Sequence, residues 1–117
     1  MSGSKHKPEH WSVQAGTRDV ARLDIPADAQ RDRDFEIFCQ LVAVAHPGRS
    51  DAQHGVRLLI NGALEWTRTV PTAHGGPDGL DVRVRRHLPV GQALRIVASS
   101  ELRNANRLSL SITAEEA

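Results

Sequence analysis

Four side chains of this sequence could bind a metal ion if the fold brought them together. Imidazole and carboxylate groups are common zinc ligands, and a zinc site needs three or four of them at about 2.0–2.3 Å. Two of the six histidines border one turn-rich segment, and a third lies close to an aspartate in the stretch TVPTAHGGPDGLDV. These candidate ligands are His46, His54, His74 and Asp78. None of them stands at the close spacing of a strong zinc motif, so solvated loop histidines are the simpler interpretation.

The same stretch could instead bind calcium, which prefers oxygen ligands. Asp78 and Asp81 could supply carboxylates, although two carboxylates this close together are also common in plain hairpin loops. Acid–base catalysis by the pair would need a concave site around them, which the sequence does not indicate. The chain has no Ser–His–Asp order, phosphate-binding glycine loop or paired CxxC. We therefore expect a protein that is not an enzyme and has no cofactor, with calcium and zinc as the only candidates.

The single cysteine, Cys39, lies in the apolar run FEIFCQLVAVA. A lone cysteine cannot form an internal disulfide. A catalytic thiol would need an exposed, electropositive setting, which this run does not provide. We expect Cys39 to be a small buried hydrophobic residue.

Composition indicates one soluble globular domain. The 117 residues are 39% hydrophobic and 25% charged, and no apolar run approaches the roughly 20 residues of a membrane-spanning helix. The net charge of +1 gives no overall field that would attract nucleic acid or an anionic membrane. The start, MSGSKHKPEH, lacks the apolar segment of a signal peptide. We interpret residues 1–9 as a mobile tail and residues 10–117 as the domain, with a cytoplasmic location as the default.

The elements that would position these residues are strands, because the hydrophobic period is two almost everywhere. The run FEIFCQLVAVA is apolar on both faces, which predicts a central strand that is covered on both sides. Asn61-Gly62 predicts a type I′ hairpin. No segment predicts a helix of any length. Seven or eight strands are expected, from residues 11–15, 21–26, 35–45, 56–60, 63–70, 80–88, 93–100 and 107–114.

Many short strands with one buried face each predict an all-β fold. We expect an antiparallel β-sandwich with jelly-roll topology. A small up-and-down β-barrel is the alternative.

The run LDVRVRRHL places Arg83 and Arg85 on one outward strand face. A solvated face is the simpler interpretation. The alternative is a surface that docks on a partner such as a second copy of the chain, with Glu36, Glu65 or Glu101 as counter-charges.

Three other apolar side chains give information about which strand faces are covered. Leu59 and Val97 interrupt the polar faces of their strands, which favours some cover over that surface. Trp66 alternates with Leu64 on one strand face, so core or edge packing is a simpler interpretation than stacking on a ligand.

Three phrases of the sequence resemble a known family when they are read in order. They are ARLDIPADAQRDRDFEIFCQLVAVA, GVRLLINGALEWTRTV and LPVGQALRIVASSELRNANRLSLSI. Over roughly residues 18–114, this order is similar to that of the galactose-binding-like jelly rolls, which include many carbohydrate-binding modules. The glycine turn in VRLLING, the turn and strand LPVGQALRI, and an asparagine-bearing loop before the last strand carry the resemblance.

The resemblance implies a module in which loop aromatics stack on a sugar ring and polar side chains hold its hydroxyls. By position, Asn104 and Asn106 match those polar groups, and Trp66 is the only aromatic residue near a suitable region. The chain departs from the family pattern because aromatic residues make up only 3% of it and tyrosine is absent.

The sequence thus predicts a non-catalytic binding or interaction module, with a saccharide as the candidate ligand and a homo-oligomer as the candidate assembly. Two alternatives stay open: a self-assembling structural subunit without a small ligand, and a metal-binding protein that uses loop histidines. The candidate ligand-binding residues are Trp66, His74, Asp78, Asn104 and Asn106.

Overall fold

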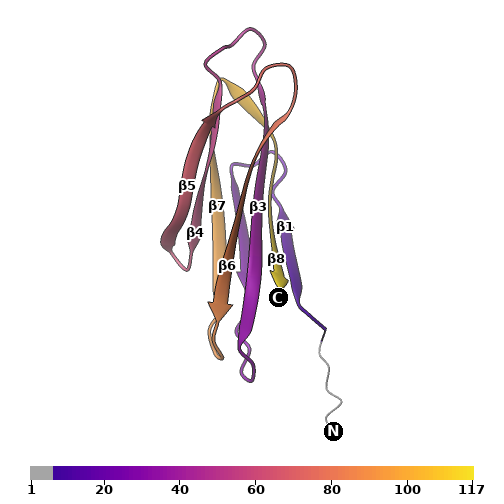
Figure 1. Ribbon diagram of the computed structural model, residues 1–117, viewed down its shortest axis with the longest axis vertical. Helices are drawn as coiled ribbons and strands as arrows, with labels where there is room; N and C mark the ends of the chain where they lie inside the picture. The colour runs from indigo at the N-terminus through magenta and orange to yellow at the C-terminus, as the bar shows by residue number, and fades with distance from the viewer. Residues whose placement is uncertain (1–6) are drawn as a thin grey trace.

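The computed structural model describes residues 7–117 (Figure 1). This part of the chain contains only strands, turns and loops, and it has no helix that could cross a membrane. The strands are β1 (His10–Gln14), β2 (Val20–Ile25), β3 (Arg33–Ala45), β4 (Gln53–Ile60), β5 (Ala63–Pro71), β6 (Asp78–Leu88), β7 (Leu94–Arg103) and β8 (Ala105–Glu116).

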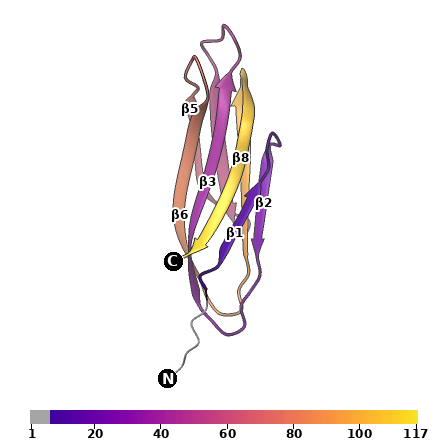
Figure 2. The same cartoon turned by 90° about the vertical axis from the view of Figure 1, so that its right-hand side faces the viewer.

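The strands form two four-stranded antiparallel sheets that pack face to face. Sheet A has the order β1-β8-β3-β6, and these four strands lie side by side in Figure 2. Sheet B has the order β2-β7-β4-β5. The chain is rolled up like one long hairpin, since β4 pairs with β5, β3 with β6, β2 with β7 and β1 with β8. This is a jelly roll, so the predicted fold is confirmed and the up-and-down barrel is wrong.

The core lies between the two sheets and is built by alternation along each strand. β3 contributes Phe35, Ile37 and Cys39, all of which are essentially inaccessible to solvent. Its other face was predicted to be covered as well, and this is wrong. Phe38 and Val42 point to the outer face of sheet A and are only half-buried, because a two-layer sandwich has no third layer to cover them.

A β-bulge changes which face of β5 reaches the core. The register between β4 and β5 shifts between Leu58 and Leu59, so Trp66 lies opposite Leu58 and Leu64 lies opposite Leu59. Trp66 therefore packs against the core, whereas Leu64 is turned to the outer face and is 51% exposed. The expectation that Leu64 and Trp66 share one face is wrong for this reason.

An ion-pair network holds the first described residues against the end of the chain. Of the predicted tail, residues 1–6 lie outside the described residues, but Glu9 accepts hydrogen bonds from Arg33 Nη1 at 2.8 Å and from Arg31 Nη2 at 2.9 Å. Arg31 also donates to Glu116 of β8 at 2.8 Å. The side chain of Arg33 is almost fully buried, so its charge depends on Glu9 for compensation. Glu9, which the sequence analysis assigned to the tail, is therefore packed against the domain.

Replacing Leu58 by alanine tests this description of the core. Leu58 is inaccessible to solvent, so Leu58→Ala should lower the free energy of unfolding by about 2–5 kcal/mol. The matched control is Leu64→Ala, which should change it by less than about 0.5 kcal/mol. Urea unfolding followed by tryptophan fluorescence measures both values. Equal losses in the two variants would contradict the bulged register.

Candidate functional site

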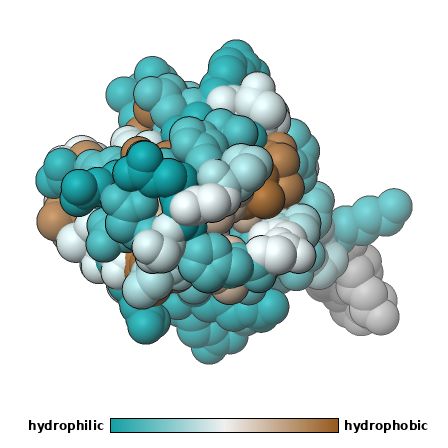
Figure 3. All heavy atoms as spheres, turned by 90° about the horizontal axis from the view of Figure 1, so that it is seen from above, coloured by the Kyte–Doolittle hydropathy of each residue, from teal (hydrophilic) through white to brown (hydrophobic). Residues whose placement is uncertain are grey.

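The loop end of the sandwich brings three of the predicted site residues together. The backbone N–H of His46 donates to the carbonyl of Asn104 at 2.8 Å, and His46 Nε2 lies 3.0 Å from Asn106 Oδ1. Asn104 has a φ of +53° and forms the tight turn between β7 and β8. These groups thus connect the β3–β4 loop to the β7–β8 turn. The surface at this end is mostly hydrophilic (Figure 3).

His54 has a structural position. It is fully buried, with Nδ1 at 2.7 Å from Thr72 Oγ1 and Nε2 at 3.3 Å from the carbonyl oxygen of Gly79. A carbonyl oxygen can only accept, so Nε2 carries the proton in this arrangement, and the Thr72 hydroxyl can donate to Nδ1. Both ring nitrogens are therefore occupied by contacts from the start of β4 to the β5–β6 loop and the start of β6, and neither is free for a metal.

The remaining candidate ligands do not complete a metal site. Asp78 Oδ2 accepts the backbone N–H of Ala73 at 2.8 Å, which closes the β5–β6 loop on itself, and His74 is exposed on that loop. Among residues 7–117 no group of three or more histidine, cysteine, aspartate or glutamate side chains is arranged to hold a metal ion. The structure thus does not bring His46, His54, His74 and Asp78 together as one ligand set.

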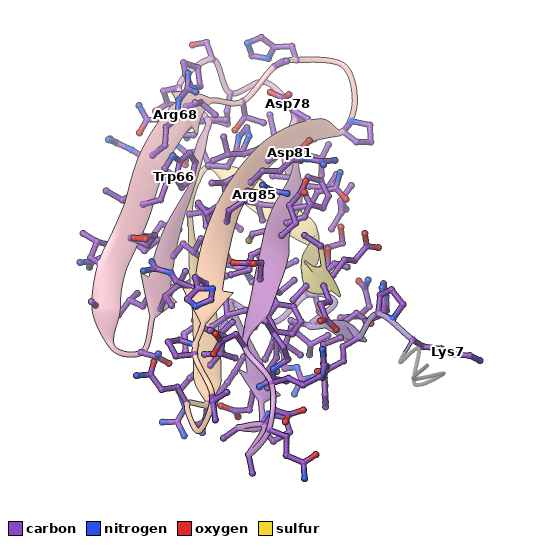
Figure 4. All side chains as sticks on the ribbon, turned by 60° about the horizontal axis from the view of Figure 1, so that its bottom comes forward. Lys7, Trp66, Arg68, Asp78, Asp81 and Arg85 are labelled. Carbon is purple, nitrogen blue, oxygen red and sulfur yellow. The ribbon has the colours of Figure 1, made fainter. Side chains whose placement is uncertain are left out.

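The two carboxylates considered as calcium ligands, Asp78 and Asp81, are separated by the pleat of β6. Asp78 lies opposite Ala43, which faces the core, whereas Asp81 lies opposite Gln40, which faces outward. Residues that lie opposite each other in an antiparallel pair point to the same face. The two carboxylates consequently project from opposite faces of the strand and cannot share one cation. Figure 4 shows Asp78 at the loop end and Asp81 further along β6.

Trp66 is not a free platform for a ligand, since its half-buried ring packs against the core from β5. The simpler sequence interpretation of this residue, as packing, is confirmed.

The arginine row lies on the outer face of sheet A and is paired within its own chain. Arg83 Nη1 is 3.4 Å from Glu36 Oε1, and Arg85 Nη2 is 3.7 Å from Glu36 Oε2. Arg86, the next residue, points inward at the edge of the sandwich and donates to Glu65 of β5. Two of the counter-charges that the docking alternative would take from a partner, Glu36 and Glu65, thus pair with arginines of the same chain.

An aromatic ring that the sequence pattern did not single out also lies on this face. The guanidinium of Arg83 lies 4.8 Å from the centre of the Phe38 ring. Phe38 stands opposite Arg83 on one side and Thr113 on the other. A hollow of about 130 Å³ lies here, lined by Glu36, Phe38, Arg83, Thr113 and Glu115. The signal in the sequence was that Phe38 alternates with Glu36 and Gln40, which are polar and point the same way.

A larger groove of about 700 Å³ lies on the outer face of sheet B, near the β4–β5 turn. Leu59 and Val97 line it together with Asn61, Asp24 and Arg95. Both apolar side chains are half-buried, so the unusual positions noted in the sequence do mark a hollowed surface.

Cys39 is buried in the core, as predicted. Burial, followed by the negative charge of Asp81, raises the pKa of its thiol from 9.0 to about 12. The thiolate is the nucleophile, so the thiol is inert near neutral pH.

Searches for related proteins do not assign the chain to a family. No family model matches it, and no curated protein matches it. One similar solved structure is that of dimeric latent PorU from Porphyromonas gingivalis, with a TM-score of 0.49 and 11% sequence identity. The likeness covers 99% of this chain but only 13% of that one. A likeness of this strength carries no argument about function.

Thiol labelling tests the burial of Cys39. At pH 8 the rise of the pKa from 9.0 to about 12 makes the thiolate fraction about a thousandfold smaller than in the unfolded chain. A maleimide or aromatic disulfide reagent should therefore label the native protein far more slowly than the urea-unfolded protein. Labelling of the folded protein at the unfolded rate would show that Cys39 is accessible.

Proposed function

We propose that the protein is a non-catalytic binding module that recognises a saccharide on the outer face of sheet A. The observation that carries the proposal is Phe38, a half-buried aromatic ring on an open sheet face, with the polar side chains of Glu36, Arg83 and Thr113 around it. An aromatic face carries partial negative charge, which suits the C–H groups on the apolar side of a sugar ring. The fold agrees with the jelly-roll resemblance of the sequence, whereas the proposed platform lies on a strand and not in a loop.

The groups around Phe38 suit sugar hydroxyls. Glu36 and Glu115 present carboxylates that accept hydrogen bonds, Arg83 can only donate, and the Thr113 hydroxyl can do both. A sugar hydroxyl is both donor and acceptor, so a mixed set of this kind can satisfy several hydroxyls at once. Sites for small ligands combine an apolar surface with a few such polar groups.

Arg83 covers part of the ring in the free protein, but this contact is easily given up. Its side chain is 68% exposed, and a cation–π contact at an exposed site is worth only about 0.5–1 kcal/mol. A ligand that stacks on Phe38 can therefore displace the guanidinium to the rim of the hollow, where it still donates hydrogen bonds.

The small size of the hollow implies weak binding by one module. About 130 Å³ is below the roughly 300–1,000 Å³ of sites that enclose a drug-sized ligand. We expect one sugar ring to be held with a dissociation constant of about 1 mM. A homo-oligomer of such modules would bind a multivalent glycan more tightly through avidity.

A sugar panel tests the proposal. Neutral hexoses, N-acetylhexosamines and hexuronic acids are each titrated into the full chain, and amide chemical shifts are followed by NMR. At least one class should give saturable shifts at residues of β3, β6 and β8. Phe38→Ala should abolish these shifts, because it removes the stacking surface.

Val42→Ala is the matched control, since Val42 is a half-buried apolar residue on the same face of β3 but does not line the hollow. It should bind as the unchanged protein does. Absence of saturable shifts with every sugar, or equal binding by the two variants, would refute the proposal.

A further inference from the structure

The outer face of sheet B has a row of apolar side chains that crosses three strands. Val97 of β7 lies opposite Leu59 of β4, and Leu59 lies opposite Leu64 of β5. Leu64 is among the most exposed large hydrophobic residues that the structure describes, and the other two line the groove of about 700 Å³. Exposed apolar surface inside a groove marks a binding surface more often than scattered apolar residues do.

Two arginines border this row and share one carboxylate. Arg22 lies opposite Val97, and its Nε is 3.0 Å from Asp24 Oδ2. Arg95 lies opposite Asp24, and its Nε is 3.0 Å from Asp24 Oδ1. Each carboxylate oxygen thus has one guanidinium partner, and the three side chains keep one net positive charge.

The outer nitrogens of both guanidinium groups are available. Arg22 and Arg95 use only Nε in these pairs, and their Nη atoms make no hydrogen bond to another residue within 7–117. Both side chains are more than half exposed. A guanidinium fork is well matched to a carboxylate, which it can bind through two parallel hydrogen bonds.

We infer that this groove binds a small molecule with an apolar body and one carboxylate group. The apolar body lies over Leu59 and Val97, and the carboxylate accepts hydrogen bonds from the Nη atoms of Arg95, with Arg22 beside it. This site lies on the opposite sheet from Phe38, so the result of its test is independent of whether the proposed saccharide site exists.

Asp24 does not prevent an anion from binding. The hydrogen bond from Arg95 is the largest influence on Asp24, and together with the hydrogen bond and charge of Arg22 it holds the pKa of Asp24 below its ordinary value, although desolvation opposes it. Asp24 therefore stays ionised at neutral pH and keeps both guanidinium groups in place. Its own charge is more than balanced by the two arginines.

The size of the groove favours a small molecule over a protein partner. About 700 Å³ falls within the roughly 300–1,000 Å³ typical of small-molecule sites. A stable protein interface needs about 800 Å² from each partner, with a larger apolar centre than one row of three side chains.

The test uses octanoate as the probe and 1-octanol as its uncharged equivalent. Both are titrated into the full chain below their aggregation limits, with amide shifts followed by NMR. Octanoate should give saturable shifts at β2, β4 and β7, and 1-octanol should bind about tenfold more weakly because it lacks the charge-assisted hydrogen bonds.

Arg95→Gln should also weaken octanoate binding about tenfold, and Leu59→Ser should weaken octanoate and octanol together. The matched control is Arg103→Gln, which removes an exposed arginine from the same face of β7 at its far end and should leave binding unchanged.

Equal binding of octanoate and octanol would overturn the inference, as would equal effects of the two arginine variants. A dimer that dissociates on Leu59→Ser, measured by sedimentation, would also overturn it, since a second copy would then occupy the groove.

Discussion

The strict alternation of side chains along β3 is the constraint on which the rest of the structure depends. β3 pairs with β8 on one side and β6 on the other, so neither of its edges is free. Its inner face anchors the core through Phe35, Ile37 and Cys39. Because successive side chains point to opposite faces, fixing these residues inward fixes Phe38 outward. A jelly roll has only two layers, so no third layer of the described chain covers that ring, and the Arg83 guanidinium lies over part of it. A half-buried aromatic ring on the outer face of sheet A thus follows directly from the packing of the core.

The hydrophobic pattern of the sequence predicted the strands and the fold class well. It did not predict features that depend on how strands distant in the sequence pair and pack. Period-two alternation located all the strands, because each has one face in the core. It could not reveal the bulge that turns Leu64 outward, since a bulge depends on pairing between β4 and β5. It also could not show that His54 binds Thr72, because this contact joins two segments whose approach is set by the whole sheet. Phe38 was overlooked because a strand that is apolar on both faces is usually covered on both faces.

The edges of the two sheets are protected against pairing with another chain. On one side the edge strands β1 and β2 are short. On the other side β5 and β6 are longer, but each has an arginine on its inward face: Arg68 lies opposite the buried Val56, and Arg86 lies opposite the buried Phe35. Inward-pointing charges, short edges and a bulge are established obstacles to edge-to-edge association. Arg86 also bonds to Glu65, which joins the two long edges across the open side of the sandwich. If copies of this chain associate, we therefore expect the contact to form between sheet faces and not between strand edges.

The two sheet faces differ in chemistry although the chain as a whole is nearly neutral. Around Phe38, the carboxylates of Glu36 and Glu115 and the guanidinium of Arg83 line one hollow, a mixed set that would suit an uncharged ligand rich in hydroxyls. On sheet B, Arg22 and Arg95 outnumber Asp24 next to aliphatic side chains, which suits an apolar ligand with negative charge. Both sets stand on paired strands, whose backbone is held by the sheet, so little ordering is needed when a ligand binds. Selectivity at either proposed site would therefore have to come from the local arrangement of side chains, because a net charge of +1 cannot supply it.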